Sequence, residues 1–408
     1  MNLDRMRTHG DDGIVDVVVV GTGAGGAPLT AELARRGLSV VALEAGRHFE
    51  PEDFTPDEMD AVGINWMSDR LSGGDDPTAF GPNNSGRGVG GSTLHWGAFT
   101  PRPDRRDLAL RTESGVGGDW PIDPDELLGY VARVEGDIGV SGQTPYPWDP
   151  DRSYAYPAAA RNAPANLVAR GCEALGIRYA DAPAAVLTRA RLQDHHGQRG
   201  ACINCGECHQ GCRVDAKAST ANTYLPAAVA AGAEIRADAM VHGIELDARG
   251  HVAAVVYRQD GVDRRQRTRA LVLAAGGVET ARLLLHTGVA NDNGQVGRNF
   301  LAHGATQVWG RFDEPVRGHR GYPSSLITED MMRPADADFA GGYLVQSLGV
   351  MPLTFATTLV RGGGLWGGDL MKRLDDARFL AGIGINAECL PSDDNRLELV
   401  EETDEYGI

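Results

Sequence analysis

Lysine is nearly absent from this chain of 408 residues, in which Lys217 and Lys372 are the only examples and arginine carries the remaining basic charge. Acidic side chains outnumber basic ones, and the formal net charge is −17 at pH 7. This charge disfavours nucleic acid and anionic membrane surfaces as direct partners. No apolar run reaches the length of a membrane-spanning helix, so we expect no direct insertion into a membrane.

An apolar segment is also missing from residues 1–13, so the sequence predicts no secretory signal of its own. We therefore expect a cytoplasmic chain, unless it is exported with a partner subunit that bears a signal. Cysteine is scarce, because only six are present and four of these fall between positions 202 and 212. Such a cluster in a cytosolic chain favours a metal site over disulfides.

Glycine, by contrast, is abundant, with 54 residues, and the first glycine motif lies within residues 15–46. A predicted buried strand leads into the spacing G-x-G-x-x-G at Gly21, Gly23 and Gly26, and a predicted helix and second strand follow. The first glycine allows a tight turn, the second lets the backbone approach a pyrophosphate, and the third lets helix and strand pack closely. Glu44 ends the second strand, where a carboxylate accepts hydrogen bonds from a ribose. The whole context predicts a dinucleotide site rather than a plain glycine-rich turn.

A second glycine stretch occupies residues 86–97 and reads G-R-G-V-G-G-S-T-L-H-W-G. Adjacent glycines let the main chain approach a ligand, while hydroxyl and N–H groups point at it. An ordinary surface loop is the alternative, but the arginine before the glycines and the histidine after them favour a binding loop. The candidate ligand-binding residues are Arg87, Gly90, Gly91, Ser92, Thr93 and His95.

The rest of the chain predicts an α/β fold. Residues 234–245 and 251–259 alternate as strands around a turn, and 270–275 form a third buried strand followed by a helix over 278–286. This second strand–glycine–helix unit fits the same open parallel sheet as the first. From residue 304 onward the pattern is strand-like but weak.

Three stretches resemble the glucose–methanol–choline (GMC) flavoprotein oxidoreductases, in particular the sugar and sugar-acid dehydrogenases that carry a cysteine motif. The stretches are residues 21–44, 86–96 and 276–289. The resemblance implies bound FAD, a Rossmann-like FAD-binding domain with a parallel sheet, and a sheet-based substrate domain. It divides the chain into a tail (1–12), an FAD-binding domain (13–110 and 220–303), an inserted cap region with the cysteine loop (111–219), and the start of a substrate-binding domain (304–408).

The resemblance also implies roles for single residues. The three glycines of the first motif would hold the pyrophosphate, and Glu44 would hold the adenosine ribose. The Gly-Gly-Ser-Thr run would line the flavin, and Val241 would contact the adenine part through its main chain. His95 stands where some members bond covalently to the flavin and others merely pack beside it, and both interpretations stay open.

Cys202, Cys205, Cys208 and Cys212 have the spacing C-x2-C-x2-C-x3-C, which is typical of a bacterial iron–sulfur site. The residue after the last cysteine is Arg213, where ferredoxins usually have proline. Three interpretations remain: an iron–sulfur cluster, a structural zinc or a remnant that packs as small apolar side chains, and disulfides. In the first interpretation the cluster would pass electrons to a partner subunit.

The proton-accepting residues of the family lie near its C-terminus, and no histidine of this chain matches them. Residues 395–400 alternate like a strand and 403–407 predict a hairpin turn, after which only Ile408 follows. We therefore expect a truncated or split chain, and the catalytic residues are not assigned.

Three functions follow as hypotheses. The first is an FAD-dependent dehydrogenase that takes hydride from an alcohol group of a sugar, sugar acid or polyol and passes electrons to a partner subunit or quinone. The second is a catalytically incompetent flavin-binding chain that needs a complementing polypeptide. The third is a sterol or long-chain alcohol oxidase that uses O2.

Overall fold

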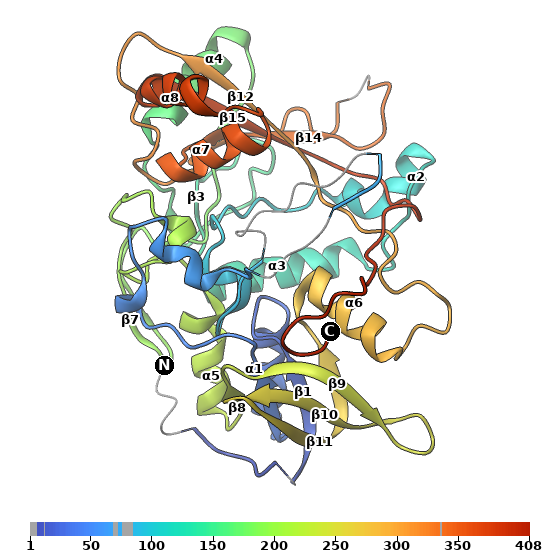
Figure 1. Ribbon diagram of the computed structural model, residues 1–408. Helices are drawn as coiled ribbons and strands as arrows, with labels where there is room; N and C mark the ends of the chain where they lie inside the picture. The colour runs from blue at the N-terminus through green and yellow to red at the C-terminus, as the bar shows by residue number, and fades with distance from the viewer. Residues whose placement is uncertain (1–5, 12, 68–71, 76–84, 335–336) are drawn as a thin grey trace.

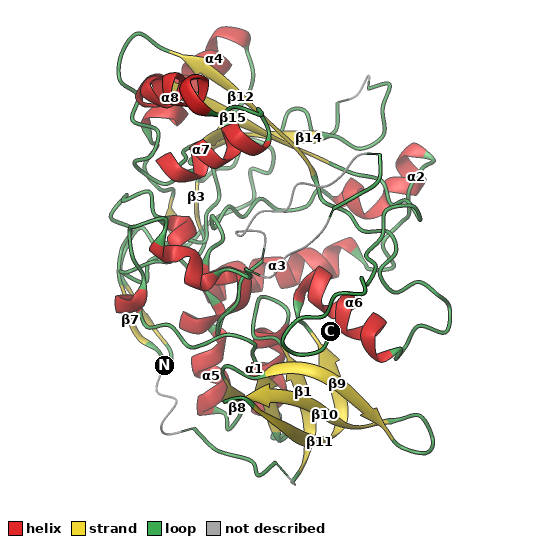
Figure 2. Ribbon diagram, in the orientation of Figure 1, coloured by secondary structure: helices red, strands yellow, loops and turns green. Residues whose placement is uncertain are grey.

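The computed structural model describes residues 6–11, 13–67, 72–75, 85–334 and 337–408. Two sheets lie at opposite ends of the molecule in Figure 1, with helix α3 (Pro124–Ile138) crossing between them. Figure 2 shows that long loops connect the two ends. The chain ends beside α6 (Gly276–Thr287), close to the lower sheet (Figure 1).

The lower sheet has six strands in the order β8-β2-β1-β11-β10-β9. The first four are parallel, whereas β10 and β9 continue the sheet in antiparallel fashion. Strand β1 lies between β2 and β11, so both predicted strand–glycine–helix units end at one edge of the same sheet. The strands are β1 (Ile14–Val20), β2 (Val40–Leu43), β8 (Glu234–Arg236), β9 (Met240–Leu246), β10 (Val252–Gln259) and β11 (Val262–Leu273).

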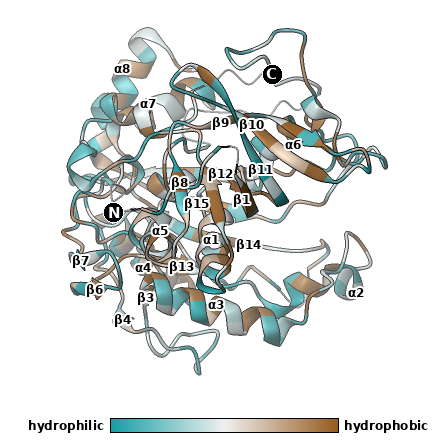
Figure 3. Cartoon of the chain, turned by 90° about the horizontal axis from the view of Figure 1, so that it is seen from below, coloured by the Kyte–Doolittle hydropathy of each residue, from teal (hydrophilic) through white to brown (hydrophobic). Residues whose placement is uncertain are grey.

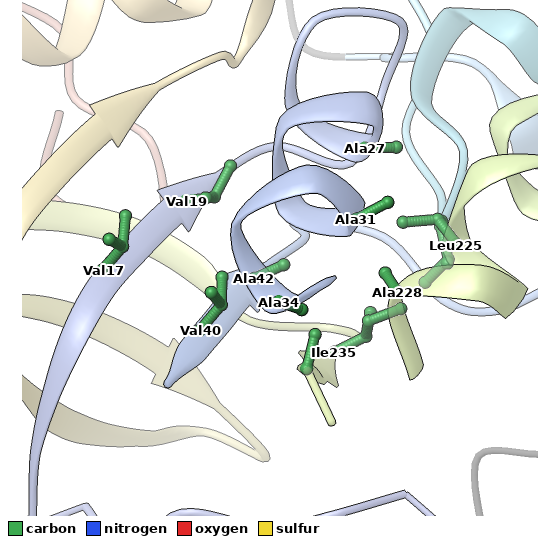
Figure 4. Close-up of a cluster of buried hydrophobic side chains, with 12 residues drawn as sticks. Val17, Val19, Ala27, Ala31, Ala34, Val40, Ala42, Leu225, Ala228 and Ile235 are labelled. Carbon is green, nitrogen blue, oxygen red and sulfur yellow. The ribbon is translucent and has the colours of Figure 1, made fainter. Parts of the chain in front are cut away.

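Helices cover both faces of this sheet, which is why residues 17–20 of β1 and all of β2 are apolar. On one face, α1 (Gly26–Arg35) and α5 (Tyr224–Ala230) pack on β1, β2 and β8. Figure 4 shows the alanines of α1 opposite the valines of β1 and β2 and beside Leu225 of α5. These small side chains bring the helix close to the sheet. On the other face, Leu283 of α6 joins the core formed by β1, β2, β9 and β10.

The upper sheet is antiparallel and has the order β12-β15-β14-β13-β5. Helix α4 (Ala163–Leu175) packs against β14 and β15. Trp309 of β12 meets Phe355 of α7 (Pro352–Arg361) edge to face, with ring centroids 5.0 Å apart. The strands are β5 (Ala180–Asp181), β12 (Gly304–Arg311), β13 (Leu326–Thr328), β14 (Tyr343–Leu348) and β15 (Leu380–Ala387).

Smaller elements complete the described chain. In Figure 3 the buried strand β1 is brown, whereas much of α8 is teal, as expected for a helix at the surface. No helix in the described ranges has the length and apolar character needed to cross a bilayer. The remaining elements are α2 (Leu110–Ser114), α8 (Gly367–Asp376), the pair β3 (Ser141–Gly142) and β4 (Tyr156–Pro157), and the pair β6 (Arg191–Gln193) and β7 (Gly197–Arg199).

The structure confirms the predicted α/β fold with a parallel sheet and a second sheet, and it corrects several details. The strand predicted over 234–245 is two strands, β8 and β9, because the chain leaves one edge of the sheet and returns at the other. Helices α7 and α8 were not predicted. Residues 395–400 form no strand, since Arg396 makes only a single bridge to Arg298.

The domain limits stay a prediction. Helix α4 and strand β5 belong to the predicted cap region of residues 111–219, yet both pack with the upper sheet. The predicted tail also contacts the lower sheet, because Asp11 forms an ion pair with Arg236 of β8.

Candidate functional site

The first glycine loop joins β1 to α1 and is positioned by main-chain contacts. The amide of Gly21 donates to the carbonyl oxygen of Leu43, at 2.8 Å, which ties the end of β1 to the end of β2. Gly21 has a φ of +96°, and a β-carbon there would lie 2.5 Å from the carbonyl oxygen of Ala274. A β-carbon at Gly26 would collide with the carbonyl oxygen of Gly21. Both glycines are therefore required by the turn itself.

The second glycine loop lies directly against the first. A β-carbon at Gly91 would stand 2.8 Å from the α-carbon of Gly23, so the two main chains touch where side chains are absent. The amide of Gly90 donates to the hydroxyl of Thr22, at 3.0 Å. The two glycine stretches, which lie far apart in the sequence, thus form one site.

A cavity of about 270 Å3 opens where the two loops meet. Its lining contains six of the residues predicted to bind the dinucleotide, which are Gly21, Gly23, Glu44, Gly91, Ser92 and Val241. Trp66, Arg282 and Ile408 also line it. The other predicted residues lie outside this lining; they are Gly26, Arg87, Gly90, Thr93 and His95.

Glu44 is buried at the centre of the site and binds protein groups with both carboxylate oxygens. Oε2 accepts from the amide and the hydroxyl of Thr22, at 3.0 and 2.7 Å. Oε1 accepts from the amides of Gly46 and Gly88, each at 3.3 Å. Burial raises the pKa of Glu44, and these hydrogen bonds oppose the rise. Glu44 therefore organises the two glycine loops, in addition to the ribose contact that the sequence predicts for it.

Two predicted residues outside the lining, Arg87 and Thr93, have side chains that hold main-chain groups near the cavity. The guanidinium of Arg87 donates to the carbonyl oxygen of Ala45, at 3.2 Å, and to the hydroxyl of Tyr406, at 2.9 Å. The hydroxyl of Thr93 donates to the carbonyl oxygen of Gly90, at 2.5 Å, and so closes the turn of the second loop. Both side chains shape the loops around the cavity.

His95 is only 6% exposed, and its Nε2 has no hydrogen-bond partner among the described residues. Burial, the Lys217 ammonium and the neighbouring His209 lower the pKa of His95 to about 4. The imidazole is therefore neutral at pH 7, and its Nε2 is an unused buried polar atom. Such an atom fits a hydrogen bond or a covalent bond to a ligand equally well.

Three residues at the site were missed by the sequence analysis. Thr22 occupies the variable position of the first motif and bonds to Glu44 and to Gly90. Thr220 donates from its hydroxyl to the carbonyl oxygen of Thr22, at 2.8 Å, and its amide donates to the hydroxyl of Thr93, at 3.0 Å. Lys217 is buried beneath the second loop. The rarity of lysine in this chain could have pointed to Lys217, whereas no local sequence pattern distinguishes the two threonines.

The structure gives no support to the metal site predicted in the cysteine loop. Within the ranges that the structure describes, no three His, Cys, Asp or Glu side chains are placed to hold a metal ion. All four cysteines line one small cavity of about 20 Å3, which has room for roughly one water molecule. The four are Cys202, Cys205, Cys208 and Cys212.

The thiols instead make packing contacts. Cys202, Cys208 and Cys212 lie against the buried cluster that contains Tyr322, and all six cysteines are free. Burial raises the pKa of Cys208 to about 12, so that its thiol is protonated. This arrangement agrees with the alternative of small apolar side chains and gives no support to an iron–sulfur cluster, a zinc site or disulfides.

A second cavity, of about 410 Å3, lies between residues 58–65, the cysteine loop and α7. Asn65 and Gln210 line it, and each has a buried amide oxygen without a hydrogen-bond partner in the described chain. Glu58 joins its walls by accepting from the amides of Leu353 and Thr354 at the start of α7. Asn65 and Gln210 thus place amide side chains among the walls of this cavity.

The first cavity fits the phosphate-bearing part of FAD. Helix α1 begins beside it with no side-chain cap and no acidic residue in its first turn. The amides at such a helix start attract an anion. A β-carbon at Gly23 would have only the α-carbon of Gly91 nearby, at 3.7 Å, so the main chain is open to a ligand there. The roles of the single residues toward FAD remain predictions.

Comparison with known proteins agrees with this geometry. The model of the GMC oxidoreductase family matches residues 23–305. The chain is 28% identical to the fructose dehydrogenase large subunit of Gluconobacter japonicus, over 96% of this chain and 78% of that protein. It is 29% identical to the 2-methyl-1,2-propanediol dehydrogenase of Mycolicibacterium austroafricanum, over 73% of this chain and 56% of that protein.

Among solved structures, pyridoxine 4-oxidase from Mesorbium loti has a TM-score of 0.59 and 17% identity, over 91% of this chain and 71% of that one. This likeness confirms the fold. The family match covers well over half of the chain, begins within the first glycine loop and includes the whole of the second. The chain therefore belongs to the GMC oxidoreductase family.

Proposed function

We propose that this chain is an FAD-dependent oxidoreductase that acts on the CH–OH group of a sugar, sugar acid or polyol. The observation that carries the proposal is the meeting of two glycine loops at one cavity beside an uncapped helix start. The names of the relatives support the donor class, because fructose and 2-methyl-1,2-propanediol are both polyhydroxylated.

When bound, the flavin would accept hydride from the carbon that bears the hydroxyl group. The residues of this chain would bind and orient it. The amides at the start of α1 would hold the pyrophosphate, and Glu44 would fix the first loop against the second through Thr22 and Gly88. Neutral His95 would offer its unpartnered Nε2 to the flavin, as a hydrogen-bonding group or as a covalent attachment point.

The cavity between residues 58–65, the cysteine loop and α7 is our candidate for the substrate. It adjoins the second glycine loop, because Asn65 pairs with Gly86 and His209 binds the carbonyl oxygen of His95. Its amide groups suit the hydroxyl groups of a polyol. None of the described residues is assigned as the base that takes the hydroxyl proton. Electrons would then pass to a partner subunit or a quinone, and the words "large subunit" in the name of the first relative favour a subunit.

The test is to purify the chain with FAD, measure the flavin stoichiometry, and screen sugars, sugar acids and polyols with a dye and with O2 as alternative acceptors. We expect one FAD per chain and dye reduction with at least one polyol. Mass spectrometry of the denatured protein would show whether FAD stays attached to the polypeptide. Failure to bind FAD, or binding of NAD in its place, would overturn the proposal.

A further inference from the structure

Lys217 is buried beneath the second glycine loop, where it is only 3% exposed. Its ammonium donates to three main-chain carbonyl oxygens, those of Leu94 at 2.8 Å, Trp96 at 3.0 Å and Cys208 at 2.6 Å. Three donors thus meet three acceptors, which is the full capacity of an ammonium group. Within the described chain no carboxylate forms an ion pair with it.

The choice of lysine here runs against the composition of the chain, in which arginine supplies nearly all of the basic charge. A guanidinium is planar and presents five donors in a rigid fork, whereas an ammonium is compact and its donors rotate. Three carbonyl oxygens arranged around one buried point suit the ammonium group of a lysine and not the planar guanidinium of an arginine. The other lysine, Lys372, is exposed on α8 and has no comparable role.

The carbonyls concerned lie on both sides of His95. Lys217 holds the carbonyls of Leu94 and Trp96, and Nδ1 of His209 lies 3.0 Å from the carbonyl oxygen of His95 itself. Three consecutive carbonyl groups of the second glycine loop are therefore bound by residues in or just after the cysteine loop. The third contact of Lys217, to Cys208, ties the two loops together directly.

We propose that Lys217 is a positioning residue that fixes the main chain at His95 and supplies a buried positive charge beside the flavin site. The cysteine loop then serves as the support of the flavin-binding loop. The inference rests on the proposed FAD site. A charge in this buried position is weakly screened, and it already acts on His95, whose imidazole it helps to keep neutral.

The charge has a measurable consequence, because a fixed cation stabilises the negative charge that a flavin gains on reduction. We expect Lys217→Met, which keeps the length of the side chain, to weaken FAD binding at least tenfold. We also expect reduced flavin to lose about tenfold more affinity than oxidised flavin, which lowers the two-electron potential by about 30 mV. Lys372→Met is the matched control and should change neither quantity.

A purely structural role would weaken binding without moving the potential. A second variant separates the two and covers the case in which Lys217→Met does not fold. Lys217→Ala should regain FAD binding when propylammonium is added during refolding, because this ion replaces the missing chain and charge. Propan-1-ol, its neutral counterpart, should not restore binding.

The measurements distinguish a failure of the proposed FAD site from a failure of the proposed role of Lys217. If the wild type does not bind FAD, the proposed function fails before Lys217 is tested. If the wild type binds FAD but Lys217→Met has the same affinity and potential, the inference about Lys217 is wrong. Restoration of Lys217→Ala by both small molecules equally, or by neither, would also overturn it.

Discussion

The two glycine loops meet at one cavity, but they are held in place by different means. The first loop, residues 21–26, is fixed mainly by main-chain contacts, through the bond from Gly21 to Leu43 and the close packing of Gly26 on Gly21, with Glu44 as a further support through Thr22. The second loop, residues 86–97, is fixed by side chains from elsewhere. The glycines of the first loop therefore encode its shape locally, whereas the shape of the second depends on distant parts of the chain.

The side chains that hold the second loop come from two places. Thr22 and Glu44 reach it from the first motif and from the end of β2. Lys217 and Thr220 reach it from the segment that follows the cysteine loop. We infer that changes at Gly21 and Gly26 damage the fold itself, while changes in these supports loosen the second loop and leave the sheet intact.

The largest effect should follow Gly26→Ala. The new β-carbon would collide with the carbonyl oxygen of Gly21, so α1 must shift away from β1. We expect the free energy of unfolding to fall by about 3 kcal/mol, at the upper end of the range for overpacked cores. Urea unfolding followed by circular dichroism measures this loss. Gly129→Ala on α3, where no atom lies within 4 Å of the new β-carbon, is the control and should be neutral or stabilising.

Glu44→Gln should be the next largest, because Glu44 touches both loops. The side-chain NH2 group of the glutamine would face N–H groups that now donate to a carboxylate. We therefore expect the free energy of unfolding to fall by about 1–3 kcal/mol. Burial raises the pKa of Glu44, so the folded chain holds this proton more tightly than the unfolded chain. The contribution of Glu44 to stability must then fall as the pH rises from its ordinary pKa through the raised one.

Glutamine has no such proton, so the difference in unfolding free energy between wild type and Glu44→Gln should shrink over that pH range. Urea midpoints measured from pH 4.5 upward give this difference. If it grows with pH instead, the four hydrogen bonds outweigh burial and the carboxylate is held in its ionised form.

Thr220→Val should act on the second loop with a smaller cost of about 1–1.5 kcal/mol, because it removes a buried hydroxyl bonded to Thr22 and Gly90. We expect FAD affinity to fall several-fold while the secondary structure is unchanged. Thr357→Val on α7 removes an exposed hydroxyl that bonds only within its own helix and is the control. Equal effects of the two changes on FAD affinity would contradict the role of Thr220 in supporting the loop.

The smallest effects concern the cysteine loop. If the thiols only pack, Cys208→Ala should cost about 1 kcal/mol and Cys205→Ala nearly nothing, since Cys208 contacts the buried cluster and Cys205 is exposed. Thermal unfolding compares the two variants. In a metal site each of the two substitutions would remove one ligand, and both variants would be destabilised to the same extent. Equal destabilisation, together with iron or zinc in the wild type, would therefore contradict the interpretation that the thiols only pack.

The central strands of the lower sheet and the first glycine loop could be predicted from the sequence because local features determine both. Valine runs that are buried on both faces, and glycines that a turn requires, are local features that a reader of the sequence can recognise. The sequence predicted the glycine loops that form the candidate site, but only some of the side chains that hold these loops in place. Thr22, Lys217 and Thr220 act through contacts across long stretches of sequence, and no local pattern reports such contacts. The metal site inferred from the cysteine spacing stays a prediction without support in the structure, because spacing along the chain does not fix the direction of each thiol.

Gly23→Val tests most directly whether the two glycine loops form one FAD site. A valine there would keep the fold, because the nearest atom to its β-carbon is 3.7 Å away, but its side chain would enter the space of the pyrophosphate. Titration of FAD by flavin fluorescence should show stoichiometric binding to the wild type and to the control Gly129→Val, and none to Gly23→Val. Normal binding of FAD by a folded Gly23→Val would contradict the account.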